Sequence, residues 1–231
     1  MKIDKNHLKI LRVSNLRELW PLQGLQTHLV GSVEFSKGGL LSDSLTIFDL
    51  STFDRIGLKG VESQSWLRTL EIDLPQTHNQ LLCSPEGRLV VRYSPSEFML
   101  SDISNVGSYW VEEIRTKTKI QKPVNCYQVP RSDGQAAFGL VGSKVLDCLS
   151  HLTPADLRFK SFQVGSVLQT LCAGISAQIL FLKKVEVKNY VIVLCDVSYA
   201  HYFWSCLSDA GSDYSMQVSG QDQWVTSFQS T

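Results

Sequence analysis

The sequence predicts an α+β fold in which two pseudo-symmetric half-domains each carry an antiparallel sheet with helices on one face. Two observations lead to this prediction. The segment that begins at Leu58 recurs from Leu140, and each copy has a glycine, Gly60 or Gly142, that opens a helical pattern. Each copy also follows the order strand, helix, strand, strand, helix. The repeat period of 82 positions, from 60 to 142, is too long for a solenoid and favours two similar halves in one body.

The first copy begins with apolar runs typical of strands and continues with a helix whose apolar residues recur at the helical period. Pro75 separates this helix from the next strands, and a Ser-Pro-Ser turn at 94–96 divides those strands. The expected elements are strands at 45–50, 55–59, 88–93 and 97–100, a helix from Gly60 and a helix within 106–116.

The second copy repeats this order, and a long stretch without charge lies in its middle. No charged residue stands between Lys160 and Lys183, which is also typical of a membrane span. Polar side chains are scattered through the stretch and Ala173-Gly174 offers a turn, so we interpret it as a hairpin. The expected elements are strands at 136–140, 164–171, 175–182 and 190–195 and helices at 142–152 and 200–210.

The segments that flank the repeats carry weaker patterns. The N-terminal part has one short helical pattern, from Leu8 to Leu19, that ends near Pro21. The C-terminal part is polar and rich in Ser and Gln, and we expect a loosely held tail, although Trp224 and Phe228 could fold back. We divide the chain into 1–44 as a lead-in, 45–211 as the repeated domain with half-repeats at about 45–120 and 130–211, and 212–231 as the tail.

The balance of charge argues against two classes of partner. The 22 basic and 22 acidic residues cancel, so no net charge attracts nucleic acid or an anionic membrane. The basic residues from Arg115 to Lys122 are spread out, and we interpret them as a solvated face. We expect neither nucleic acid nor a membrane as a partner.

The cysteines indicate the redox compartment. The six cysteines form no CxxC pair and no cluster with histidine at zinc spacing, which argues against a metal site. The first twelve residues lack the long apolar core of a signal peptide. We therefore expect a cytoplasmic protein with reduced thiols and no metal.

Several strings of the sequence resemble a known superfamily. They are FDLSTFDRIGLKG at 48–60, GRLVVRYSPSEFML at 87–100 and VSYAHYFWSCL at 197–207, with shorter matches at 156–158 and 162–167. The chain resembles the folate-binding aminomethyltransferase superfamily, which includes the glycine cleavage T-protein, and the run around Tyr199 points to the gamma subunit family of heterotetrameric sarcosine oxidase. The likeness implies the aminomethyltransferase folate-binding fold without its C-terminal β-barrel, because too few residues follow Gly211.

The resemblance also implies a function. The chain would be an accessory, non-catalytic subunit that docks with alpha, beta and delta subunits, and the complex would oxidatively demethylate sarcosine to glycine. FAD, FMN, NAD and tetrahydrofolate would reside in the partner subunits, with none bound by this chain. A second hypothesis is a stand-alone tetrahydrofolate-binding protein or aminomethyltransferase-like regulator that uses the central cleft between the halves.

One departure from the transferase pattern affects the folate site. In the transferases, a carboxylate of an Asp-Asp pair just before the strand that matches 89–93 contacts the folate. Here these positions read Gly87-Arg88, and neither a glycine nor a permanent cation can accept a pterin N–H. Glu86 is the nearest carboxylate, either a surrogate anchor or a solvated turn residue. The candidate folate-binding residues are Glu86 and Arg88, and no residue is assigned to catalysis or to a metal.

Other polar and aromatic residues have a structural interpretation beside the functional one. Asp54 either caps a turn or pairs with Arg55. His201 stands in an aromatic helix start, where a histidine is more often packed or exposed than catalytic. The aromatic residues at 199–204 and 224–228 belong to the core or, where exposed together, to a docking surface.

Overall fold

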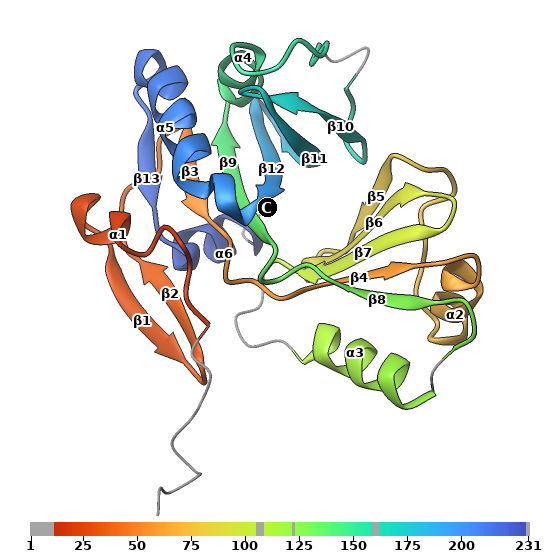
Figure 1. Cartoon of the computed structure of the whole chain (residues 1–231). Helices are drawn as coiled ribbons and strands as arrows, with labels where there is room; N and C mark the ends of the chain where they lie inside the picture. The colour runs from red at the N-terminus through yellow and green to blue at the C-terminus, as the bar shows by residue number, and fades with distance from the viewer. Residues whose placement is uncertain (1–11, 105–108, 122, 159–161, 230–231) are drawn as a thin grey trace, which may run out of the picture.

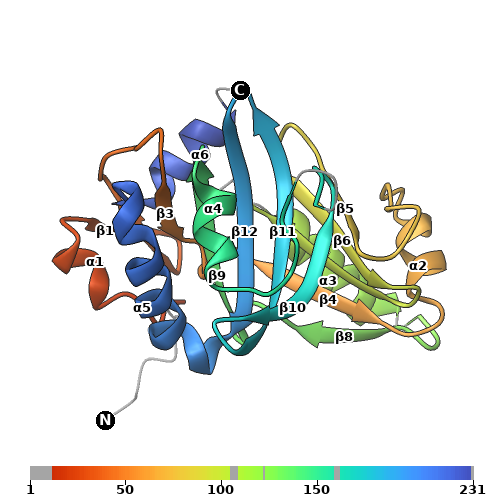
Figure 2. The same ribbon diagram turned by 90° about the horizontal axis from the view of Figure 1, so that it is seen from above.

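Two open β-sheets pack against each other, and helices cover the outer face of each. The computed structural model describes residues 12–104, 109–121, 123–158 and 162–229. Figure 1 shows how the described helices and strands are arranged, and Figure 2 shows helices on both outer sides of the paired sheets. Within the described residues, neither sheet closes into a barrel. The predicted α+β class, with antiparallel sheets and helices on one face of each, is confirmed.

The five-stranded sheet comes from the first half of the chain. Its elements, with the helices that cover it, are β4 (Arg55–Lys59), α2 (Ser63–Thr69), β5 (Gln80–Cys83), β6 (Arg88–Ser94), β7 (Glu97–Asp102), α3 (Trp110–Gln121) and β8 (Tyr127–Pro130). The strand order is β5-β6-β7-β4-β8, and every neighbouring pair is antiparallel. Helices α2 and α3 pack on one face, where Trp66 and Val111 meet Leu58 and Phe98.

The six-stranded sheet comes mainly from the second half. Its elements, with their helices, are β3 (Thr46–Asp49), β9 (Gln135–Gly142), α4 (Val145–Ser150), β10 (Val167–Cys172), β11 (Ile175–Val185), β12 (Lys188–Asp196), the 3-10 helix η2 (Val197–Tyr199), α5 (Ala200–Gly211) and β13 (Gln217–Ser219). The order is β10-β11-β12-β9-β3-β13, and only the β13–β3 pair of this sheet is parallel. Helices α4 and α5 bury Leu149, Phe203 and Leu207 against its outer face.

The uncharged stretch is a hairpin, as predicted. Strands β10 and β11 pair in antiparallel register from Val167↔Leu180 to Cys172↔Ile175, with Ala173-Gly174 in the turn. Both turn residues have positive φ, +51° and +77°, which suits a tight connection between twisted strands. In the described part of the chain, no helix has the length and apolarity needed to cross a membrane.

The two halves exchange one strand each. β3 precedes β4 in the chain but pairs with β9 of the other sheet, and β8 precedes β9 but pairs with β4. Gly60 and Gly142 mark equivalent points, with φ of +137° and +142°. At each glycine a Cβ would overlap the carbonyl oxygen just before the exchanged strand, that of Asn125 or Ser44. The repeat seen in the sequence therefore corresponds to the same backbone crossing in both halves, where only glycine fits.

The N-terminal part contains more structure than the sequence indicated. Helix α1 (Leu19–Leu22) contains Pro21, and it is followed by the hairpin of β1 (Gln26–Val30) and β2 (Val33–Lys37). The beginning of the expected helical pattern, at Leu8, lies outside the described residues. Trp20 anchors α1 to the larger sheet, because its indole N–H donates to Asp49 Oδ2 of β3 at 3.0 Å.

The expectation of a loosely held C-terminal tail is wrong. After the 3-10 helix η3 (Ser212–Tyr214), β13 joins the sheet beside β3, and helix α6 (Gln221–Gln229) packs into the core between the sheets. Trp224 is fully buried, and its indole N–H donates to Ile103 O at 2.7 Å. Trp224 and Phe228 lie one helical turn apart on α6, so they form one apolar stripe although their neighbours are polar.

Candidate functional site

The space between the two sheets, where the resemblance would place a folate cleft, is filled. A void of about 10 Å³ remains in it, roughly what a single water molecule requires. Apolar side chains from both sheets line this void, among them Leu89, Met99, Ile103, Leu180, Ile192 and Leu194. A pterin ring system is many times larger than this void.

The C-terminal helix completes the same packed core. Trp224 stacks on Phe228 of α6 and meets Phe48 of β3 edge-on, with ring centroids 5.9 and 5.5 Å apart. Gly139 of β9 provides room for the indole, since a Cβ there would lie 2.8 Å from Trp224 Cζ3 and 2.7 Å from Leu50 Cδ1. The sequence patterns did not predict that this helix completes the core. The four-residue spacing of Trp224 and Phe228, which places both on one face of a helix, was the pattern that could have indicated it.

The structure places the two candidate folate residues in and after one exposed turn. Side chains alternate along β6, so Leu89 faces the void while Arg88 faces the opposite side. There the Arg88 guanidinium lies 5.5 Å from the centre of the Trp110 ring of α3. Glu86 is exposed, and a hydrogen bond with the Ser84 side chain lowers its pKa. Neither residue lines the void, and their role toward folate stays a prediction.

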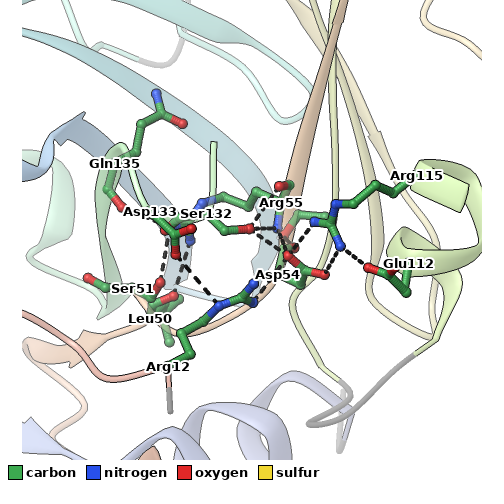
Figure 3. Close-up of polar contacts among 11 residues, drawn as sticks. Arg12, Leu50, Ser51, Asp54, Arg55, Glu112, Arg115, Ser132, Asp133 and Gln135 are labelled. Atoms are coloured by element: carbon green, nitrogen blue, oxygen red, sulfur yellow. Dashed lines mark hydrogen bonds and ion pairs between the residues drawn. The ribbon is translucent and has the colours of Figure 1, made fainter. Parts of the chain in front are cut away.

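A second concave region, which we call the arginine cleft, lies beside edge strand β8. It has a volume of about 350 Å³. Four guanidinium groups line it, from segments far apart in the sequence: Arg12, Arg55 of β4, Arg115 of α3 and Arg131. Figure 3 shows three of these arginines around Asp54. Sequence reasoning did not assemble them, because no local pattern relates four such distant residues.

Asp54 holds two of the arginines together. Its carboxylate pairs with Arg115 at 2.8 Å and with Arg12 at 3.1 Å, and it accepts a hydrogen bond from the Ser132 hydroxyl at 2.5 Å (Figure 3). Burial raises the pKa of Asp54, but the bonds from Arg115 and Ser132 and the charges of Arg12 and Arg115 outweigh burial and lower it. The sequence predicts that Asp54 caps a turn or pairs with Arg55. Asp54 does accept a hydrogen bond from the backbone N–H of Arg55, but its ion pairs join it to Arg115 of α3 and to Arg12 of the N-terminal segment.

Arg55 forms the buried floor of the cleft. Only 3% of the residue is exposed, and its guanidinium donates to four backbone carbonyls, those of Leu50, Ser51, Ser132 and Gln135. Burial, with the nearby charge of Arg12, lowers the pKa of Arg55 to about 10. The side chain therefore remains cationic at neutral pH, while its Nε–H is buried and has no hydrogen-bond partner.

Arg131 lines the cleft from the chain that follows β8. Its Nη2 donates to Glu97 Oε1 at 2.5 Å, and its guanidinium lies 5.7 Å from the centre of the Tyr93 ring. Its Nε–H is buried without a hydrogen-bond partner, as in Arg55. Arg115 also departs from expectation, because it belongs to this cluster and is only 28% exposed rather than part of a solvated face.

The remaining sequence candidates do not converge on a site. His201 is exposed at the start of α5, and Tyr202 of the same turn donates to Ala173 O at 2.8 Å. The six cysteines are free, and burial raises the pKa of Cys172 and of Cys195 to about 12. Among the described residues, no group of three or more His, Cys, Asp or Glu side chains is arranged to hold a metal ion.

Two solved structures share this fold. One is a heterotetrameric sarcosine oxidase from Corynebacterium sp. U-96 in complex with pyrrole 2-carboxylate, with 18% identity, a TM-score of 0.65 and coverage of 87% of this chain and 95% of that one. The other is the glycine cleavage system aminomethyltransferase T from Bartonella henselae, with 13% identity, a TM-score of 0.65 and coverage of 92% of this chain and 61% of that one. The class of fold is therefore that of the aminomethyltransferases and of a sarcosine oxidase chain.

The sequence itself identifies the family. The model of the sarcosine oxidase, gamma subunit family matches residues 64–213. The chain belongs to this family, and the predicted resemblance is confirmed. A comparison with curated proteins gave no match.

Proposed function

We propose that this chain is an accessory, non-catalytic gamma subunit of a heterotetrameric sarcosine oxidase. Membership of the gamma subunit family supports the assembly. The observation that carries the non-catalytic part is the packed space between the sheets, where apolar side chains leave a void of about 10 Å³. A chain filled in this way contributes shape and surface to an assembly, and it offers no room at its centre for a cofactor.

In this proposal the chemistry belongs to the partners. The complex converts sarcosine, water and dioxygen to glycine, formaldehyde and hydrogen peroxide, or passes the one-carbon unit to tetrahydrofolate. FAD, FMN, NAD and tetrahydrofolate are bound by the alpha, beta and delta subunits in the cytoplasm. The exposure of Glu86 and Arg88, both away from the void, is consistent with a chain that has kept the scaffold without its folate pocket.

The direct test is co-expression of this chain with alpha, beta and delta subunits, followed by purification through a tag on this chain. We expect the four chains to copurify and to produce hydrogen peroxide from sarcosine. Expressed alone, the chain should carry no flavin, bind no NAD and show no turnover. Turnover by the isolated chain, or an assembly that forms and works equally well without it, would contradict the proposal.

A matched pair of variants tests the role of the packed space. Phe53→Ala removes a buried ring from this core, and Arg68→Gln changes an exposed residue of α2 as the control. In the assembled complex, both variants should retain the wild-type kcat for each assembled tetramer. A loss of kcat confined to Phe53→Ala in intact tetramers would show that the space takes part in the chemistry. Calorimetric titration of the isolated chain with tetrahydrofolate tests the stand-alone alternative, which predicts micromolar binding.

A further inference from the structure

The arginine cleft gathers more positive than negative charge on its walls. Among the described residues that line it, Arg12, Arg55, Arg115 and Arg131 face one carboxylate, Asp133. Asp133 lies at the rim with 83% of its side chain exposed, and the distance from Arg12 Nε to Asp133 Oδ1 is 3.8 Å. Like charges brought together in this way repel each other unless anions offset them.

Three carboxylates behind the walls offset most of this charge, and with Asp133 they equal the four arginines in number. Asp54 pairs with Arg12 and Arg115, Glu112 also pairs with Arg115, and Glu97 pairs with Arg131. These pairs hold the side chains in place, so the guanidinium groups are already ordered before any ligand arrives. Preorganised groups lose little conformational entropy on binding.

Two arginines that line the cleft each carry an unsatisfied donor. The Nε–H groups of Arg55 and Arg131 are buried and have no hydrogen-bond partner. More than nine in ten buried polar groups in proteins have a partner, so two orphaned cationic donors behind the wall of one cleft require an explanation. Burial lowers the pKa of Arg55 most and the nearby charge of Arg12 lowers it further, although the charge of Asp54 acts in the opposite direction.

We propose that the arginine cleft binds the oxyanion group, carboxylate or phosphate, of a small molecule. The guanidinium fork matches the paired oxygens of both groups. A volume of about 350 Å³ lies within the usual range of small-ligand sites, about 300–1,000 Å³. Arg55 lies between this cleft and the small void at the packed centre and lines both of them, and the proposal does not depend on the proposed function.

The test is calorimetric titration of the full chain with inorganic phosphate and, separately, with succinate, at constant ionic strength and with chloride as the reference anion. Arg131→Gln should weaken binding by about tenfold or more, because it removes one charge-assisted donor group. Asp133→Asn should tighten binding by roughly threefold, because it removes the rim carboxylate that repels the anion. Arg68→Gln, an exposed arginine of α2, should leave the affinity unchanged.

The opposite effects of the two variants separate a site from general salt stabilisation. Asp133 is exposed, so Asp133→Asn folds and remains informative if circular dichroism shows that Arg131→Gln does not. Saturable binding of phosphate alone identifies a phosphate ligand, and saturable binding of succinate alone identifies a carboxylate. Heats equal to those of chloride, or an affinity that neither variant changes, would overturn the proposal. Binding to the isolated chain that is absent from the assembled complex would also overturn it, in favour of an acidic side chain of a partner subunit.

Discussion

Replacing Trp224 with alanine should lower the free energy of unfolding by about 3–5 kcal/mol, the usual cost of removing a large buried aromatic side chain. Trp224 is 0% exposed and packs against Phe48, Tyr190 and Phe228. The substitution also leaves the carbonyl of Ile103 without the indole donor at 2.7 Å. Because α6 has few other large apolar residues, we expect this helix to detach before the sheets unfold.

A double-mutant cycle with Gly139→Ala tests the packing itself. A methyl group at position 139 would lie 2.8 Å from the Trp224 ring, so Gly139→Ala alone should cost about 1–3 kcal/mol through overpacking. In the Trp224→Ala background the indole is absent and the methyl group fills part of the cavity. The two substitutions should therefore be less than additive by about 1 kcal/mol or more.

Urea denaturation followed by circular dichroism measures each corner of the cycle. The matched control is Gly134→Ala, because the nearest atom to a Cβ there is 3.7 Å away and the backbone has no positive φ. If Trp224→Ala costs less than about 1 kcal/mol, the helix does not contribute to the core as described. Strict additivity of the two substitutions would show that position 139 and the indole are not in contact.

Three further predictions concern other parts of the molecule. The pKa of Asp54 lies below its ordinary value of 3.8. Its ionised form therefore stabilises the fold above that pH, and this contribution is lost as the pH falls through the folded-state pKa. Asp54→Asn should lower the free energy of unfolding by about 2 kcal/mol at neutral pH and by less in acid, as measured by urea denaturation at several pH values. Gly60→Ala and Gly142→Ala should each lower the free energy of unfolding by more than about 2 kcal/mol in the same assay, because the added Cβ clashes with the backbone and the residue has a strained φ. An effect at one glycine alone would contradict the equivalence of the halves. Cys172 and Cys195, whose pKa burial raises to about 12, should react with a thiol reagent at neutral pH only after urea unfolds the protein, and rapid labelling of the native chain would contradict their burial.

Local patterns in the sequence predicted most strands and helices of the repeated domain. The strand expected at 55–59 is β4 with the same bounds, and the hairpin within 164–182 is β10 and β11. These elements follow from apolar runs, turn residues and glycines, which act within a few residues of each other. The exchange of β3 and β8 could not be predicted in this way, because a buried apolar run does not indicate which sheet receives it.

The arginine cleft and the C-terminal helix depended on tertiary contacts. Arg12 and Arg131 are more than a hundred positions apart, and each reads in the sequence as an ordinary surface cation. The polar composition after Gly211 masked the stripe of Trp224 and Phe228, whose burial depends on space left by Gly139 in another strand. The mean composition of a segment is therefore a weaker guide than the spacing of its few large apolar residues.

The strand exchange explains why the centre of the molecule is closed. Since β3 and β8 each cross to the opposite sheet, the chain passes between the sheets twice, at 50–54 and 131–134. Asp54 and Arg55, which belong to the arginine cleft and its ion pairs, lie at the first crossing. The crossing segments place Leu50 and Phe53 in the inter-sheet core, while β13 and α6 add Trp224 from the C-terminal segment. The scaffold thus fills its centre from both halves and from the C-terminal segment, which leaves its outer surface and the arginine cleft beside β8 as the places where it can meet other molecules.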